Sequence, residues 1–140
     1  MIIVGGIIKN SDNKYLFVRE RKEGFYGMYN LPAGKLEENE LLLDGAKREI
    51  KEETGYTVDI KGIVQIGDAE MFKSFIFLCE IDSNQEYYNS EGLLSIEWLS
   101  LDEIKNIKDK LRSPKLTLDA IKNVEDKKVC SLDIIKQLIN

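Results

Sequence analysis

Apolar and polar positions along the chain predict a mixture of strands and helices. The first nine residues are almost wholly apolar or β-branched, which predicts a buried strand. The turn-prone segment 10–13 separates it from a second strand at 15–19. Further strands are predicted at 56–66, 71–81 and 94–99, and helices at 40–54, 101–107, 114–123 and 132–139. Strands outnumber helices and do not alternate regularly with them, which favours an α+β class with a layered, mixed sheet over a doubly wound fold.

Three loops complete this organisation. The segments 24–27 and 30–34 predict loops on either side of a short strand, and the polar segment 83–91 is a third loop. Gly55 directly follows the helix predicted at 40–54, where a glycine commonly ends a helix.

Length and composition narrow the class of protein. The 140 residues are 43% apolar and 32% charged, which indicates one soluble globular domain over 1–140. No apolar run reaches the roughly 18 residues of a membrane span, and the apolar start has no basic flank like that of a signal peptide. We therefore expect no membrane partner and a cytoplasmic location. The apolar first strand, if it lies at a sheet edge, offers a way to form a homodimer.

Charge and missing residue types exclude several kinds of chemistry. The chain has 20 basic and 25 acidic residues, a net charge of −5, which argues against a nucleic-acid partner. It has no histidine, so Ser-His-Asp catalysis, Cys-His catalysis and histidine-ligated zinc are all excluded. Cys79 and Cys130 lie far apart and predict buried free thiols rather than a disulfide or a metal site.

The segment 40–54 carries the most informative charges. On a helical wheel Leu43, Ala46 and Ile50 form an apolar stripe, and Glu40, Asp44, Lys47 and Lys51 lie on the solvated side. Glu49, Glu52 and Glu53 share an arc of about 100° that borders the stripe.

This crowding of glutamates can be interpreted in two ways. One is an acidic face that meets only solvent. The other is a metal site, because like charges one turn apart repel unless a cation relieves them. Ligands that are all oxygen suit Mg²⁺ or Mn²⁺, and such a site often takes substrate phosphates as further ligands.

The same segment resembles the Nudix box, G-x5-E-x7-R-E-U-x-E-E-x-G-U, where U is a bulky aliphatic residue. All seven fixed positions match at the right spacing, and Ile50 fills the first U. Tyr56 departs from the pattern, since the last U is usually aliphatic. The matching positions are Gly34, Glu40, Arg48, Glu49, Glu52, Glu53 and Gly55.

The resemblance implies a Nudix-type αβα sandwich with a mixed sheet, in which the box forms a loop, a helix and a second loop. It also implies that Glu49, Glu52 and Glu53 bind the metal, with the Gly34 carbonyl as a further ligand. Glu40 and Arg48 are implied to brace the helix as a pair, and Gly34 and Gly55 to shape its two loops. A general base is implied as well, either the box residue Glu49 or the later loop residue Glu91.

Cations and aromatic side chains near these loops are candidates for substrate binding. Arg19, Arg21 and Lys22 end the second strand, and Lys35 follows Gly34, so each could contact phosphate. Tyr26 and Tyr29 flank a loop and are candidates for stacking on a base, as is Phe72. Phe75 and Trp98 lie in apolar strands and are predicted to be core residues.

Members of the family hydrolyse small nucleotide-like pyrophosphates, and three functions follow for this chain. The segment 30–37, with alanine between proline and glycine, and the segments 98–104 and 111–114 are similar to the NudJ-type branch. That branch implies an Mg²⁺-dependent phosphatase acting on nucleoside di- and triphosphates or on the thiamine pyrimidine pyrophosphate. The alternatives are an ADP-ribose or sugar-nucleotide pyrophosphatase and a non-catalytic ligand sensor, although a sensor typically loses box glutamates.

Overall fold

The computed structural model describes residues 1–82 and 92–138, and the strands form two sheets. The larger sheet has the order β4-β1-β6-β5, and the smaller has the order β3-β2-β7. β1 pairs in parallel with β6 and antiparallel with β4, so the larger sheet is mixed, as predicted. The strands are β1 (Ile2–Ile8), β2 (Tyr15–Glu20), β3 (Tyr29–Asn30), β4 (Ala33–Lys35), β5 (Val58–Asp68), β6 (Lys73–Ile81) and β7 (Leu93–Leu99).

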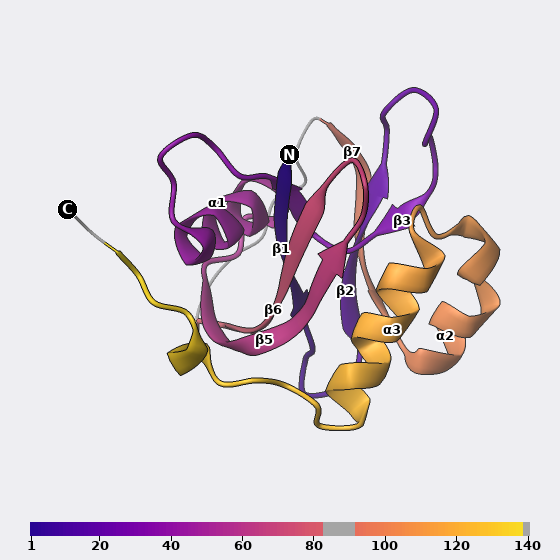
Figure 1. Ribbon diagram of the computed structural model, residues 1–140. Helices are drawn as coiled ribbons and strands as arrows, with labels where there is room; N and C mark the ends of the chain where they lie inside the picture. The colour runs from indigo at the N-terminus through magenta and orange to yellow at the C-terminus, as the bar shows by residue number, and fades with distance from the viewer. Residues whose placement is uncertain (83–91, 139–140) are drawn as a thin grey trace.

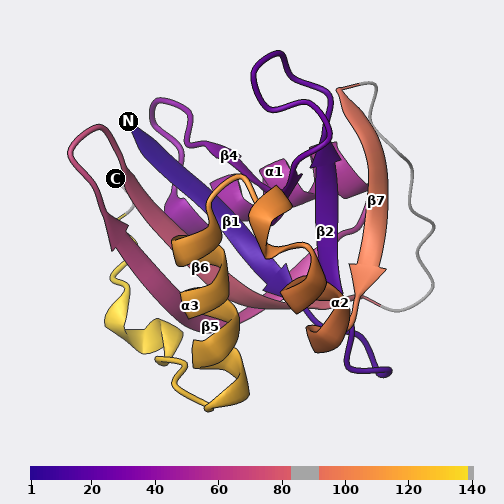
Figure 2. The ribbon, with the colours of Figure 1, turned by 90° about the vertical axis from the view of Figure 1, so that its right-hand side faces the viewer.

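Helices cover both faces of the strands, which gives the predicted αβα sandwich (Figure 1). α1 (Leu42–Thr54) lies on one side, and α2 (Leu101–Asn106) and α3 (Pro114–Glu125) lie on the other. Two short 3-10 turns, η1 (Lys108–Lys110) and η2 (Leu132–Ile134), complete the elements. Viewed from the side of α3, the strands lie behind that helix and α1 lies behind the strands (Figure 2).

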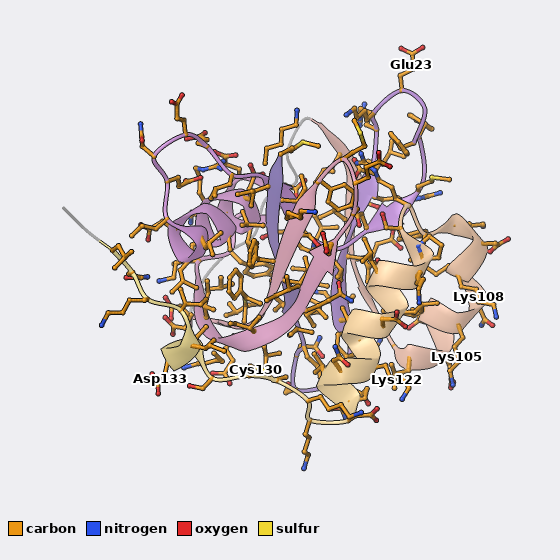
Figure 3. The ribbon with its side chains drawn as sticks, in the orientation of Figure 1. Glu23, Lys105, Lys108, Lys122, Cys130 and Asp133 are labelled. Atoms are coloured by element: carbon orange, nitrogen blue, oxygen red, sulfur yellow. The ribbon has the colours of Figure 1, made fainter. Side chains whose placement is uncertain are left out.

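Two apolar clusters hold the layers together. The cluster below α3 contains Ile7, Phe17, Val64 and Ile121, and the cluster below α1 contains Val4, Ile8, Ala46, Ile50 and Phe77. Phe75 and Trp98 pack against the second cluster, which confirms that they are core residues. On the side of the molecule formed by α2, η1 and α3, the side chains of Lys105, Lys108 and Lys122 point outward (Figure 3).

The ends of the helices show how local sequence shapes the fold. Gly55 ends α1 in the left-handed conformation at φ 81°, and its N–H donates to the Lys51 carbonyl. Ser100 and Glu103 form a reciprocal cap at the start of α2. No helix among the described residues is long and apolar enough to cross a lipid bilayer.

The structure corrects four expectations from the sequence. The helix predicted at 132–139 is wrong in the described residues, where only Leu132–Ile134 form a 3-10 turn. Cys130, which precedes it, is exposed rather than buried, whereas Cys79 is buried as predicted. β1 lies inside the larger sheet, so it is not an edge at which a second chain could pair. Glu40 precedes α1, and its side chain is only 14% exposed.

Candidate active site

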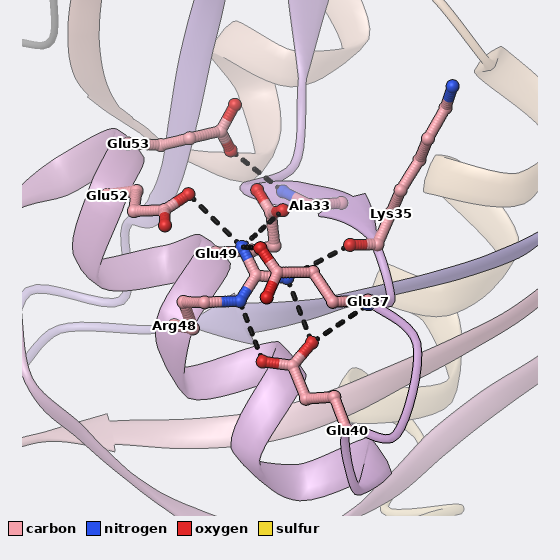
Figure 4. Close-up of polar contacts among 8 residues, drawn as sticks. All are labelled: Ala33, Lys35, Glu37, Glu40, Arg48, Glu49, Glu52 and Glu53. Atoms are coloured by element: carbon pink, nitrogen blue, oxygen red, sulfur yellow. Dashed lines mark hydrogen bonds and ion pairs between the residues drawn. The ribbon is translucent and has the colours of Figure 1, made fainter.

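The glutamates of interest lie where α1 passes over β4. Ala46 and Ile50 are buried against the sheet, and this contact sets the rotation of the helix. Glu49 and Glu53 lie beside these apolar positions and face β4, whereas Glu52 lies further out and is 58% exposed (Figure 4). Glu49 and Glu53 therefore contact the backbone of β4. Of the three box glutamates, only Glu52 exposes most of its side chain to solvent.

Arg48 holds Glu40 in a two-point ion pair. Its Nε donates to Glu40 Oε2 at 2.7 Å, and its Nη2 donates to Glu40 Oε1 at 2.9 Å. Nη2 also donates to the Lys35 carbonyl at 3.0 Å, so the pair links α1 to the end of β4. The hydrogen bonds from Arg48 hold the pKa of the Glu40 carboxyl below its usual value.

The same guanidinium contacts two of the box glutamates. Arg48 Nη1 donates to Glu49 Oε1 at 2.9 Å and to Glu52 Oε2 at 3.2 Å (Figure 4). Burial raises the pKa of the Glu49 carboxyl, the Arg48 contacts oppose that shift, and the nearby charge of Glu52 adds to it. Arg48 thus offsets part of the repulsion among these carboxylates.

Gly34 and Glu49 touch where β4 meets α1. A Cβ placed on Gly34 would lie 2.1 Å from Glu49 Oε2 and 2.2 Å from Glu49 Cδ. No real side chain fits at that distance, so glycine at this position leaves the space that the Glu49 carboxylate occupies. Gly34 does not have a positive φ, so its backbone conformation does not require glycine. The requirement is steric.

Glu53 is the most deeply placed of the three box glutamates. The Ala33 N–H donates to Glu53 Oε1 at 2.9 Å, which fixes the carboxylate against β4. Burial is the main cause that raises the pKa of the Glu53 carboxyl to about 8, and the charges of Glu49 and Glu20 raise it further. A carboxyl with these neighbours is more easily ionised when a cation lies beside it.

The residue types at this point fit a hard divalent ion. The three carboxylates offer oxygen ligands alone, and two of them are held as neighbours in a place where negative charge is disfavoured. Within residues 1–82 and 92–138, no three acidic, cysteine or histidine side chains already form a compact ligand cluster.

A cavity of about 320 Å³ opens on the other face of β4. Ala33, Gly34 and Lys35 line it, so the same strand contacts the box glutamates on one side and the cavity on the other. The cavity reaches between the strands and the first turn of α3, where Leu116 and Thr117 line it. Its remaining walls are Met1, Ile3, Lys22, Asn30, Leu31, Gln65, Phe72, Ser74, Ile76, Arg112 and Ser113.

Arg112 is held in place at the wall of this cavity. Its Nη1 donates to Glu20 Oε1 at 3.0 Å, and its guanidinium lies 3.9 Å from the centre of the Phe25 ring. Its backbone N–H donates to the Tyr29 carbonyl at 2.9 Å. These contacts join the segment before α3 to β2, β3 and the loop at Phe25, and they fix a guanidinium paired with Glu20 at the cavity wall.

A family model described as NUDIX domain matches residues 1–120. This chain belongs to the Nudix family. The match includes β1 to β7, α1 and the greater part of α3, and with them both the box glutamates and the cavity.

Individual relatives agree with this assignment. The 8-oxo-dGDP phosphatase NUDT18 of Danio rerio is 41% identical over 81 residues, which are 56% of this chain and 24% of that protein. Phosphatase NudJ of Escherichia coli O1:K1 / APEC is 30% identical over 114 residues, 76% of this chain and 72% of that protein. A solved NUDIX hydrolase from Nitrosomonas europaea has a TM-score of 0.86 and 28% identity, and the match covers 98% of this chain and 96% of that one. The chain spans 40% or less of the length of several curated relatives that it matches.

Only some of the residues predicted from the sequence to contact substrate lie at the cavity of this Nudix chain. Lys22, Lys35 and Phe72 line the cavity, but Arg19, Arg21, Tyr26 and Tyr29 do not. Arg19 donates to the Gly27 carbonyl and lies over the Tyr29 ring, whose hydroxyl donates to Glu97. Arg21 lies 3.4 Å from the Leu93 carbonyl, and Tyr26 is 67% exposed. Glu91 lies outside the described residues.

Several residues at the cavity of this Nudix chain were not found from the sequence. Gln65 and Ser74 stand in predicted strands, where a polar residue commonly faces solvent. Arg112 also lines the cavity, but nothing in its local sequence marks it as a neighbour of the other lining residues. Only the packing of α3 against β5, which joins segments some 50 residues apart, places Gln65 beside Leu116.

Proposed function

We propose that the chain hydrolyses a phosphoanhydride bond in a small nucleotide-like pyrophosphate, with Mg²⁺ or Mn²⁺ bound by Glu49, Glu52, Glu53 and the Gly34 carbonyl. One observation carries this proposal. The box glutamates and the cavity lie on opposite sides of β4 and share the residues Ala33 and Gly34. A substrate in the cavity can extend its phosphates past this short strand to the glutamates.

Charge supports the same arrangement. A pyrophosphate is strongly negative, and so is the protein, with a net charge of −5. Lys22 and Lys35 line the cavity and offset part of this repulsion, whereas Arg112 at the same wall is paired with Glu20. A bound divalent ion supplies the remaining positive charge beside the phosphoryl oxygens.

The protein's own residues then have separate tasks. Glu49 accepts the proton of the attacking water as general base, and Glu91 is the alternative base from the later loop. The oxygen of that water bonds to phosphorus, the anhydride P–O bond breaks, and the leaving phosphate keeps the electron pair. Arg48 and Glu40 hold α1 against the end of β4, so that the glutamates keep their positions.

Of the candidate substrates, we favour a nucleoside di- or triphosphate or a thiamine pyrimidine pyrophosphate. Two of the relatives described above are named phosphatases, and one of these names contains a nucleoside diphosphate. ADP-ribose and sugar nucleotides are the alternative, with the same bond chemistry and a different leaving group. We also propose that 1–140 forms one domain, because Cys130 in the segment after the matched region pairs with Ile63 of β5.

Phosphate release tests this function directly. Each candidate substrate is incubated with Mg²⁺ and with EDTA, with or without inorganic pyrophosphatase, and ADP-ribose is also coupled to a phosphatase that detects monoester products. Orthophosphate that appears with Mg²⁺ alone supports the phosphatase. Signal that needs a coupling enzyme supports the pyrophosphatase alternative. No turnover with any substrate, together with retained ligand binding, contradicts the proposal and supports the ligand sensor.

A further inference from the structure

Two buried polar atoms lie in the cavity wall without a hydrogen-bond partner among the described residues. They are Gln65 Oε1 on β5 and Ser74 Oγ on β6, and the whole of Ser74 is only 4% exposed. A buried polar atom without a partner is destabilising, so native proteins contain few of them. Here the two residues that carry such atoms line the same cavity.

The Gln65 side chain is oriented by the helix above it. Its Nε2 donates to the Leu116 carbonyl at 3.1 Å. A backbone carbonyl can only accept a hydrogen bond, so the amide nitrogen must face Leu116 and the amide oxygen must face away from it. The unpartnered atom of Gln65 is therefore an acceptor in a fixed position.

The Ser74 hydroxyl occupies space that a glycine leaves free. Ser74 lies opposite Gly67 in the β5–β6 pair, and a Cβ on Gly67 would be 2.1 Å from Ser74 Oγ. Gln65 lies opposite Ile76, so Gln65 and Ser74 are diagonal neighbours whose α-carbons are separated by roughly 7–8 Å. A single flat ring can contact side chains at this spacing.

We propose that Gln65 and Ser74 determine substrate specificity by binding a heteroaromatic ring that carries an exocyclic amino group. The amino N–H donates to Gln65 Oε1, and the Ser74 hydroxyl donates to a ring nitrogen. Phe72, Ile76 and Leu116 line the same cavity and supply apolar contacts to the ring. This inference rests on the proposed function, because it describes the ring-binding part of the same substrate site.

Binding of matched ligand pairs tests this inference separately from turnover. The ligands are α,β-methylene diphosphates, in which a P–C–P link replaces the anhydride and prevents hydrolysis there. One pair is adenosine and purine riboside, and the other is a 4-aminopyrimidinylmethanol and its analogue without the amino group. Calorimetry in Mg²⁺ measures each affinity for the wild type, Gln65→Met, Ser74→Ala and the control Lys22→Met.

We expect the wild type to bind the amino ligand of at least one pair about fivefold or more tightly than its partner. Gln65→Met should bring that ratio close to one, because it removes the acceptor of the amino group. Ser74→Ala should weaken both members of a pair, because both contain the ring nitrogen to which the hydroxyl donates. Lys22→Met should weaken both members of a pair equally, because a lysine at this wall contacts phosphate. A ratio near one in the wild type for both pairs, a ratio that Gln65→Met preserves, or wild-type affinities in Ser74→Ala, overturns the inference. Absence of phosphate release in the turnover assay would instead contradict the proposed function, since these affinities do not depend on catalysis.

Thermal unfolding of the free protein gives a second readout. Ser74→Ala removes a buried hydroxyl that has no partner, so we expect its Tm to equal or exceed that of the wild type while ring binding weakens. A Tm several degrees lower would show that the hydroxyl is already satisfied in the free protein, and would overturn its assigned role. Ser74→Ala also tests the inference alone if Gln65→Met fails to fold.

Discussion

The α-carbon of Gly34 lies directly against the carboxylate of Glu49, where a Cβ would be 2.1 Å from Oε2. The position of the carboxylate thus depends on the absence of a side chain in β4. A side chain on Gly34 in β4 would clash with Glu49 in α1, and this clash links the box glycine to the position of a box glutamate. It also separates the role of Gly34 from that of glycines needed for a left-handed backbone.

We expect Gly34→Ala to displace the Glu49 carboxylate and to lower kcat by about a hundredfold, because a shift of about 1 Å in a reacting group has that effect. Overpacking should also reduce the free energy of unfolding by about 1–3 kcal/mol. Steady-state phosphate release and urea unfolding measure the two effects.

Gly24→Ala is the matched control for this variant. Gly24 has nothing within 4 Å of its Cβ direction but adopts φ 87°. Alanine there should reduce stability by about 1 kcal/mol through backbone strain, with little change in kcat. If Gly34→Ala retained the wild-type kcat, the contact between Gly34 and Glu49 would have no part in catalysis.

Glu53→Gln should lower turnover by about two orders of magnitude or more while the fold stays intact. The amide oxygen of glutamine can still accept the Ala33 N–H, so the contact with β4 survives. What is lost is a negative oxygen ligand for the metal. Phosphate release and Mn²⁺ titration measure activity and metal affinity, and Tm in EDTA measures the fold.

Glu38→Gln makes the same change in charge on an exposed residue of the preceding loop. It should leave turnover and Mn²⁺ affinity close to those of the wild type. Equal losses in the two variants would mean that net charge, rather than the position of Glu53, sets the metal affinity.

The α+β class could be predicted from local signals, and the αβα sandwich followed from the resemblance that the box residues carry. Runs of apolar and β-branched residues mark β1, β2 and β6, and Gly55 marks the end of α1. Residues 132–138 were wrongly predicted as helix for a physical reason. The Cys130 backbone pairs with Ile63 of β5, and this extended contact directly precedes the segment. Leu132 and Ile135 then pack on the core from a single 3-10 turn.

The cavity could not be predicted because its orientation depends on irregular pairing. The β5–β6 register shifts between Ile63 and Gln65. Beyond this shift the alternation is inverted, so that Gln65 faces the cavity while Ile66 is 63% exposed. A bulge of this kind leaves no clear mark in a hydropathy pattern.

The Glu40–Arg48 pair should show a measurable coupling energy. The two side chains are 14% and 22% exposed and share two short hydrogen bonds. In a double-mutant cycle with Glu40→Gln and Arg48→Met, we expect a coupling of about 1–3 kcal/mol in the free energy of unfolding. Urea unfolding at pH 7 in EDTA provides the four values.

Lys115 and Asp119 form a matched control pair on α3, with side chains 90% and 55% exposed. The corresponding cycle there should give a coupling of no more than about 0.5 kcal/mol, because solvent screens the exposed pair. A coupling for Glu40 and Arg48 no larger than this value would contradict a bracing role.

Glu125 should make stability depend on pH in the acid range. Its carboxylate accepts hydrogen bonds from Lys9 Nζ, at 2.8 Å, and from the Tyr15 hydroxyl, which ties α3 to β1 and β2. These two contacts, that of Lys9 above all, hold the pKa of Glu125 below its usual value. A depressed folded-state pKa stabilises the fold above the unfolded pKa of about 4.3, and this stabilisation is lost as the pH falls through the folded-state value.

Wild type should therefore exceed Glu125→Gln in free energy of unfolding by about 1 kcal/mol at pH 7. At pH values below the folded-state pKa of Glu125 the two should converge, because the wild-type carboxylate becomes protonated. Urea unfolding at half-unit pH intervals measures the difference, and a gap that stays constant from pH 7 to pH 3 would show that the charge of Glu125 does not stabilise the packing of α3.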